Sequence, residues 1–327
     1  MTMNSRRHFL KLSAGALAVP AFARSTVGQT PWPAAKPIRA IVPFSAGSTI
    51  DILGRIVLDP LSRQLGQTIV VENRGGAGGS LGSAAVAKAD PDGYTLLINA
   101  AAHSGAPAAY PNLPYDAAAD FAAVASFGSV PNVLLVAPSK GIKNLQELVA
   151  KAKDGSMSFA SAGVGSATHW AAERFIVSAG FKATHVPFRG GPEALTEVMT
   201  GRVDFIFIGI SSGLPFIQNK QLVALAVSSA KRSPTLPDLP TTLEAGYKDS
   251  DFNYWNGMLV PAKTQRPIVD RLHSETSKAL ALPEVQQKLA AQGVEPAPLT
   301  PSEMDAMIRR EIALNIKIAK DAGLKFN

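Results

Sequence analysis

From Ile38 onward the sequence alternates apolar strand-like runs with loops of small residues and helical patterns. The first three runs are IRAIVPF, IVVEN and YTLLINA, and they lead into SAGSTID, RGGAGGSLGSAAVAKA and AAHSG. Strands that are nearly continuous in Val, Ile and Leu and alternate with helices are typical of parallel sheets covered on both faces. The chain is therefore predicted to be an α/β protein. Each turn also presents unpaired N–H groups at a helix N-terminus, where the helix dipole favours an anion.

The same alternation continues along most of the chain. Strands are expected at 38–44, 68–72, 95–99, 132–137, 156–160, 184–187, 203–208, 222–228 and 254–260. Helices are expected between them at about 49–65, 79–89, 144–153, 167–179, 191–200 and 212–219. The last third is predicted to be helical, at 267–281, 283–292 and 301–322, with Pro at or near each start.

A strand-loop-helix unit recurs in the middle of the chain. The segment MSFASAGVGSATHWAAERF resembles IRAIVPFSAGSTIDILGRI in its pattern of small residues. Two similar lobes that face one cleft would produce this pattern, and ligands of open α/β sheets bind at the carboxyl ends of the strands. We place the lobe crossings near residues 126 and 252, so that lobe 1 is 24–125 plus 253–327 and lobe 2 is 126–252.

Residues 1–23 are typical of an export signal. The stretch SRRHFLK, at 5–11, is basic without any acidic residue, an apolar stretch follows, and small residues favour cleavage after Ala23. This stretch resembles the twin-arginine signal at every consensus position, and an ordinary secretory signal with two arginines is the alternative. The apolar stretch is about half of the roughly 20 residues that cross a membrane, and Pro20 interrupts it.

Composition excludes several classes of function. Loss of the signal removes three positive charges from a net charge of +7, and the remaining basic residues form no run, which argues against nucleic-acid binding. Cysteine is absent, which excludes disulfides, thiolate metal sites and cysteine nucleophiles. His169 and Glu173 share a helix face without an evident third ligand, so we expect no metal and no cofactor.

Candidate binding residues lie where a strand ends and a helix begins. In PFSAGSTID, Ser48 or Thr49 is placed to cap the helix, and Gly47 allows close backbone approach. In SAGVGSATHW, Ser166 and Thr168 repeat this arrangement. The full set of candidate ligand-binding residues is Phe44, Ser45, Ala46, Gly47, Ser48, Thr49, Asp51, Asn99, Ala100, Gly165, Ser166, Thr168, His169, Arg189 and Asp204.

Four of these candidates have a structural interpretation beside the functional one. Asp51 also suits the helix dipole, and His169 is as consistent with a structural histidine as with a carboxylate contact. Arg189, in the Gly-rich turn VPFRGGPEAL, is suited either to holding an anion or to solvent. Asp204 is acidic within the apolar strand GRVDFIF, which requires a buried partner or a polar cleft, and we favour the cleft edge.

The glycine run GGAGGSLGS looks like a nucleotide-binding loop. Its glycines at 76, 78 and 82 miss the dinucleotide spacing, however, and no Gly-Lys-Ser/Thr follows for a phosphate loop. We interpret the run as a flexible turn with a close-packed helix behind it, which makes it scaffold.

The segment GISSG at 209–213 matches the nucleophile elbow G-x-S-x-G and follows an apolar strand. A serine hydrolase would use Ser211 with a later aspartate, Asp238 or Asp251, and His273. His273 lies inside a helical pattern and not on the loop that a triad base needs, so the hydrolase is a minor alternative.

Several segments together resemble the substrate-binding proteins of tripartite tricarboxylate transporters, the Bug family of periplasmic receptors. These segments are PFSAGSTIDILGR (43–55), LGQTIVVENRGGAGGSLGSAAVAKADPDGYTLL (65–97), SAGVGSATHW (161–170), VPFRGGPEAL (186–195), GRVDFIF (201–207) and PTLPDLPTTLEAG (234–246). The resemblance covers essentially the whole mature chain. It implies a two-lobed periplasmic binding protein fold of the type II, Venus flytrap class, in which each lobe is a mostly parallel sheet flanked by helices.

The resemblance also implies how the ligand is held. Loops corresponding to Phe44 to Asp51 and Gly163 to His169 would bind a carboxylate, largely through backbone groups and ordered water. Family members usually have Pro-Gly-Gly where this chain has Ala46-Gly47-Ser48, and Tyr where it has Phe188. These departures bear on the identity of the ligand more than on the fold.

We therefore expect a periplasmic solute-binding protein that is not an enzyme. It would bind a small organic acid as a monomer and deliver it to the membrane subunits of a tripartite tricarboxylate-type transporter. A sensory receptor that binds the same kind of ligand and reports to a signalling protein is the alternative from another class.

Overall fold

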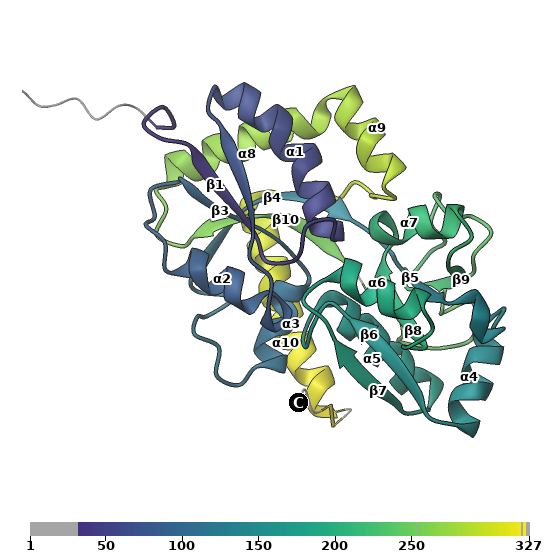
Figure 1. The fold of residues 1–327 in the computed structure, drawn as a ribbon. Coiled ribbons are helices and arrows are strands. Elements are labelled where there is room, and N and C mark those ends of the chain that lie inside the picture. The colour runs from purple at the N-terminus through teal and green to yellow at the C-terminus, as the bar shows by residue number, and fades with distance from the viewer. Residues whose placement is uncertain (1–31, 253, 322, 325–327) are drawn as a thin grey trace, which may run out of the picture. The chain divides into compact units, whose positions relative to one another are not determined.

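The computed structural model describes residues 32–252, 254–321 and 323–324, whose strands form two five-stranded sheets (Figure 1). The first sheet has the order β2-β1-β3-β10-β4 and contains β1 (Ile38–Val42), β2 (Ile69–Asn73), β3 (Thr95–Ala100), β4 (Phe121–Ser129) and β10 (Trp255–Pro261). The second has the order β7-β6-β8-β5-β9 and contains β5 (Asn132–Val136), β6 (Met157–Ser161), β7 (Ala183–Pro187), β8 (Phe205–Gly209) and β9 (Val223–Val227). The export signal predicted for residues 1–23 lies outside the described residues.

Among the described strands, one strand of each sheet runs against the other four. In the first sheet β10 is antiparallel to both of its neighbours, β3 and β4, and in the second sheet β5 is antiparallel to β8 and β9. Each of these strands directly follows a passage of the chain from one sheet to the other. The two mostly parallel sheets confirm the predicted two-lobed α/β fold.

The passages between the sheets lie at two places. The chain leaves the first sheet after Ser129 and enters the second at Asn132, and it returns between Val227 and Trp255. The lobe boundaries near residues 126 and 252 stay a prediction, and below we call the part built on the first sheet the first lobe and the part built on the second sheet the second lobe.

Helices pack on both faces of the first sheet (Figure 1). On β3 the side chain of Ile98 faces Gly54 of a helix on one side, and the next residue, Asn99, donates a hydrogen bond to Ser83 on the other side. This alternation is the normal consequence of the strand pleat. The helices of this lobe are α1 (Thr49–Leu65), α2 (Ser80–Ala87), α3 (Ala102–Ala109), α8 (Arg266–Ala281), α9 (Pro283–Ala291) and α10 (Pro301–Asp321).

The second sheet is covered in the same way. On β8 the ring of Phe207 packs against Phe175 at a centroid distance of 5.5 Å, while the next side chain, Ile208, faces Gly191 and Gly213. Phe175 lies on α5 and the two glycines lie on α6 and α7, so helices flank both faces. The helices of this lobe are α4 (Leu145–Asp154), α5 (Ala167–Ala179), α6 (Gly191–Met199) and α7 (Ile210–Gln218).

Two elements, β4 and α3, were not expected from the sequence. The β4 segment FAAVASFGS is rich in Ala and Ser, which have weak strand preference, and it forms because it pairs with β10 along its length. The α3 segment AHSGAPAA has a Gly, a Pro and no capping side chain, and it is held by packing on α10. Tertiary contacts therefore override local preference at both places. Within the described residues, no helix combines the length and the apolar character needed to span a bilayer.

Candidate functional site

The N-termini of two helices, one from each lobe, line the same small cavity. Helix α1 of the first lobe contributes Ser48 and Thr49, and α5 of the second lobe contributes Ser166, Ala167 and Thr168. The cavity has a volume of about 20 Å³, which is roughly the space of one water molecule. Its lining is completed by Phe44, Ala162, Gly191, Ile208, Ser212 and Tyr254.

The loop between β1 and α1 brings an unpaired hydroxyl to this cavity. Gly47 adopts a φ of +77°, in the left-handed region that favours glycine, and the N–H of Ser48 donates to the carbonyl of Ser45 at 3.1 Å. Ser48 occupies the N-cap position, but its side chain makes no capping bond, and its buried Oγ has no hydrogen-bond partner among the described residues. Leaving a buried hydroxyl unpaired costs about 1–3 kcal/mol, so this group favours a polar atom that enters the cavity.

Asp51 holds the shape of this loop from within. Its carboxylate accepts hydrogen bonds from the Gly47 N–H at 2.9 Å, the Asn73 amide at 2.9 Å and Arg55 Nε at 3.0 Å. Burial by itself would raise the pKa of Asp51, but the hydrogen bonds from Arg55, Gly47 and Asn73 outweigh burial and lower the pKa below its ordinary value. Asn73 also donates to the Phe44 carbonyl at 3.0 Å, which ties β2 to the same loop.

The loop before α5 is held by a second set of bonds. The Oγ of Ser166 caps α5 by accepting the N–H of His169 at 3.3 Å, and Thr168 Oγ1 accepts the N–H of Ala162 at 2.8 Å. The N–H of Gly165 donates to His169 Nδ1 at 3.0 Å, so the proton of the neutral ring is on Nε2, 3.4 Å from Glu173. Ser166 and Thr168 therefore line the cavity from a turn that these bonds hold in place, with His169 buried beneath it.

Hydroxyl groups of the two lobes also meet directly. Thr49 Oγ1 lies 3.0 Å from Ser212 Oγ, and Ser212 lies 3.3 Å from the Gly47 carbonyl. Ser45 Oγ donates to the carboxylate of Glu193, at the start of α6, at 2.8 Å. Ser212 and Glu193 were not predicted as site residues, because only the folded chain brings α6 and α7 against the loop before α1.

The residues of the hydrolase alternative point elsewhere. Ser211 Oγ donates to the backbone carbonyl of Gln292 at 2.8 Å, and His273 Nδ1 lies 2.7 Å from the carbonyl of Val124. The structure therefore does not bring Ser211 and His273 into hydrogen-bond contact. Within GISSG it is the next serine, Ser212, that reaches the cavity.

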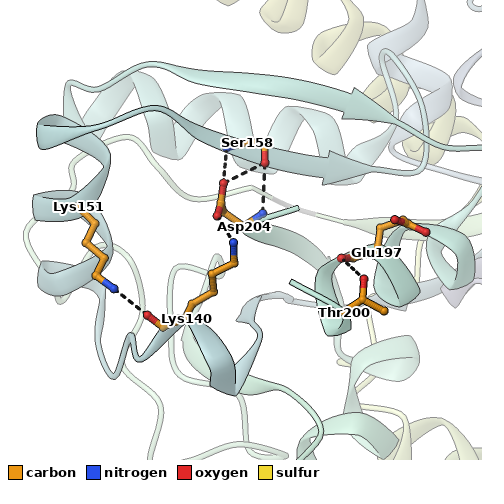
Figure 2. A network of polar contacts seen from close by, with 6 residues as sticks. All are labelled: Lys140, Lys151, Ser158, Glu197, Thr200 and Asp204. Carbon is orange, nitrogen blue, oxygen red and sulfur yellow. Dashed lines mark hydrogen bonds and ion pairs between the residues drawn. The ribbon is translucent and has the colours of Figure 1, made fainter. Parts of the chain in front are cut away.

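Asp204 lies apart from the other candidates. It directly precedes β8, whereas the loops of the cavity follow the carboxyl ends of β1, β6 and β8. Figure 2 shows Lys140 and Ser158 converging on its carboxylate, with Lys140 Nζ at 2.5 Å and the Ser158 N–H at 2.8 Å. Burial would raise the pKa of Asp204, but these bonds lower it. The partner of this acidic residue is thus the half-buried Lys140, and the structure does not place Asp204 at the edge of the cavity.

The remaining candidates are also outside the cavity lining. Asn99 donates to Ser83 Oγ and accepts the N–H of Ala100, so its amide is used within the first lobe. The side chain of Arg189 is exposed and makes no hydrogen bond or ion pair with the described residues. Ala46 is exposed at the turn before α1. Nowhere in the described part of the chain do three His, Asp or Glu side chains gather as a metal site would require.

Comparison with known proteins identifies the family of the chain. The profile of the tripartite tricarboxylate transporter family receptor matches residues 53–324. The chain belongs to the Bug family of these receptors. Membership confirms the resemblance found in the sequence.

Three solved structures share the fold over nearly their whole length. The periplasmic binding protein BugD is 32% identical with a TM-score of 0.84, and 89% of this chain covers 99% of that protein. R. palustris Rpa4515, solved with adipate, is 32% identical with a TM-score of 0.85, with coverage of 89% and 98%. MatC (Rpa3494) from Rhodopseudomonas palustris, solved with bound malate, is 30% identical with a TM-score of 0.83, with coverage of 87% and 99%.

Proposed function

We propose that this Bug receptor is a periplasmic protein that binds a small organic acid between its lobes and passes it to the membrane subunits of a tripartite transporter. The observation that carries this proposal is the meeting of the α1 and α5 N-termini, one from each lobe, at one hydroxyl-lined cavity. Binding of adipate and of malate by two relatives supports the same class of ligand.

The cavity suits a carboxylate, although none of its described lining side chains supplies a positive charge. The described side chains that line it carry hydroxyl and apolar groups and no basic group. First-turn N–H groups lack intrahelical acceptors, and the dipoles of both helices place partial positive charge at the same cavity. A dicarboxylate would present one carboxylate to each helix. Serine and threonine hydroxyls supply further donors.

Binding requires movement of the lobes or of the loops between them. A cavity of about 20 Å³ is too small for an acid of several carbons. The ligand would therefore enter with the lobes apart, and it would shift the equilibrium toward closure only through contacts that are better in the closed state. The hydroxyl contact of Thr49 with Ser212 joins the two lobes and favours the closed state with or without the ligand.

We expect Ser212→Ala to weaken binding of the cognate acid roughly five- to twelve-fold. The substitution removes one hydroxyl from the cavity and the bond to Thr49, and a hydrogen bond of this kind contributes about 1–1.5 kcal/mol. Ser62→Ala is the control, because Ser62 on α1 donates to the Gln67 carbonyl at 2.8 Å within the first lobe and does not line the cavity. Isothermal titration with adipate, malate and a panel of other organic acids measures both dissociation constants.

The same titrations test the proposed ligand class. Tight binding of a neutral sugar together with no binding of any acid would reject it. Ester hydrolysis that disappears in Ser211→Ala would instead support the hydrolase. Delivery to a transporter is tested by loss of uptake of the identified acid when the gene for this receptor is deleted.

A further inference from the structure

The glycine run at 75–79 makes a backbone contact across the lobes. A Cβ built on Gly78 would lie 1.8 Å from the carbonyl oxygen of Val164, and one built on Gly163 would lie 2.9 Å from the Gly78 nitrogen. Two backbones, one from each lobe, thus meet with no room for a side chain between them. This loop was interpreted from the sequence as scaffold, and its contact with the second lobe gives it a further role.

The same carbonyl is bound by a second residue of the first lobe. The hydroxyl of Tyr110, directly after α3, donates to the Val164 carbonyl at 2.9 Å. Burial raises the pKa of Tyr110 to about 12, so this hydroxyl keeps its proton and its role as donor. Gly105 of α3 adds a third close approach, since a Cβ there would lie 2.3 Å from Trp170 Nε1 on α5.

These contacts all involve the first turn of α5 or the segment that leads into it. Val164 lies two residues before Ser166, the N-cap of α5, which lines the cavity. Neither Gly78 nor Tyr110 lines the cavity itself. A contact between lobes is lost when the lobes separate, so it stabilises only the closed arrangement.

We infer that Gly78 and Tyr110 are positioning residues that set how closely the two lobes approach at the α5 N-terminus, and thereby set the affinity for the ligand. The absence of a Cβ at Gly78 permits the approach, and the Tyr110 hydroxyl fixes it. This inference rests on the proposed function only where ligand affinity is measured.

Gly78→Ala tests the inference against a closely matched control. Gly78 has φ 59° and ψ 22°, and Gly66, the C-cap of α1, has φ 63° and ψ 26°. Alanine therefore meets the same backbone strain at both positions, but a Cβ at Gly66 has nothing within 4 Å. We expect similar losses of melting temperature, and at least tenfold weaker binding in Gly78→Ala alone. Tyr110→Phe, which adds no bulk, is expected to weaken binding about three- to tenfold.

A second readout does not depend on the ligand class. The chain contains no cysteine, so cysteines placed at exposed Arg63 on α1 and Lys153 on α4 accept spin labels selectively. Double electron–electron resonance then gives the distance distribution between the lobes. We expect Gly78→Ala to shift it to longer distances than Gly66→Ala.

The outcomes separate the two proposals. If adipate, malate and the other acids bind neither the wild type nor any variant, yet the distances shift, the ligand class is wrong and the role of Gly78 stands. If the two glycine variants give equal affinities and equal distance distributions, the positioning role is rejected. If Gly78→Ala alone fails to fold, Tyr110→Phe decides, and unchanged affinity and distances in that variant reject the role.

Discussion

Replacing Asp51 with alanine is expected to lower the free energy of unfolding by about 2–3 kcal/mol and to weaken binding of the cognate acid at least tenfold. The substitution removes the acceptor of the Gly47 N–H and of Arg55 Nε, and it leaves the half-buried Asn73 amide with only the Phe44 carbonyl. Gly47 and its neighbours then lose the constraint that presents Ser48 and Thr49 to the cavity. Urea denaturation followed by circular dichroism measures the stability, and isothermal titration measures the binding.

Asp59 on the same helix provides the control. Like Asp51 it pairs with an arginine four residues later, but its side chain is 66% exposed whereas that of Asp51 is 4% exposed. Exposed pairs of this kind contribute about 0.3–0.5 kcal/mol, so Asp59→Ala should change both readouts little. Equal losses of unfolding free energy and of affinity in Asp59→Ala and Asp51→Ala would contradict this prediction. They would show that the Asp–Arg pairs of α1 matter and that the bonds of Asp51 to Gly47 and Asn73 do not.

The Asp51 carboxylate also predicts a dependence on pH. Its pKa in the folded protein is lowered relative to the unfolded chain, so its contribution is complete above the ordinary pKa of aspartate. That contribution is lost as the pH falls through the lowered folded value. Asp51→Asn should therefore remove part of the acid sensitivity while it keeps the size of the side chain.

The second large effect concerns His103. Because of this residue, the free energy of unfolding is expected to fall by roughly 3 kcal/mol as the pH falls from about 6.5 to about 4. His103 is fully buried on α3, and burial lowers its pKa from 6.5 to about 4. Nε2 lies 2.8 Å from the Ala117 carbonyl, and the ring packs edge-on against Phe121 at a centroid distance of 4.7 Å. Between these pH values the unfolded chain binds a proton that the folded protein does not, so unfolding becomes more favourable as acid is added.

His103→Gln isolates this effect. Glutamine offers an N–H to the same carbonyl and does not titrate, so the variant should show a flatter dependence of stability on pH between 6.5 and 4. Its stability at pH 7.5 is expected to be lower than that of the wild type by about 1–2 kcal/mol, because the aromatic packing is lost. Denaturation curves at half-unit pH steps measure both quantities. A slope equal to that of the wild type would assign the acid sensitivity to other groups, among them His185, whose pKa burial lowers to about 3.

The strand-loop-helix alternation was sufficient to predict most of the fold. Helices α1 and α5 begin and end where the sequence predicted, because each starts after a serine at the N-cap position and ends before a glycine in the left-handed conformation. The segments β4 and α3 could not be found in this way. In α3 the glycine and the proline offset the helix preference of the alanines, and in β4 alanine has only a weak preference for strand. Both segments form when β10 and α10, from the end of the chain, pack against them.

The candidate site was only partly predictable for a related reason. Ser48, Thr49, Ser166 and Thr168 carry a local signal, a small polar residue between a strand and a helix, and the structure brings them to one cavity. Glu193, Ser212 and the contact of Gly78 depend on how the lobes meet, which no local pattern encodes. Asp204 illustrates the opposite case. Its partner Lys140 is distant in the sequence, so in the sequence Asp204 looks like an isolated acidic residue of a binding site.

The central position of β10 in the first sheet has a consequence for the order in which the lobes are completed. A growing chain that ends before Trp255 contains all five strands of the second sheet, but it leaves the edges of β3 and β4 that pair with β10 without a partner. Unpaired edges of this kind are sites of aggregation. The lobe that is synthesised first is thus the last to be finished, and a nascent chain must protect an open sheet while the second lobe folds.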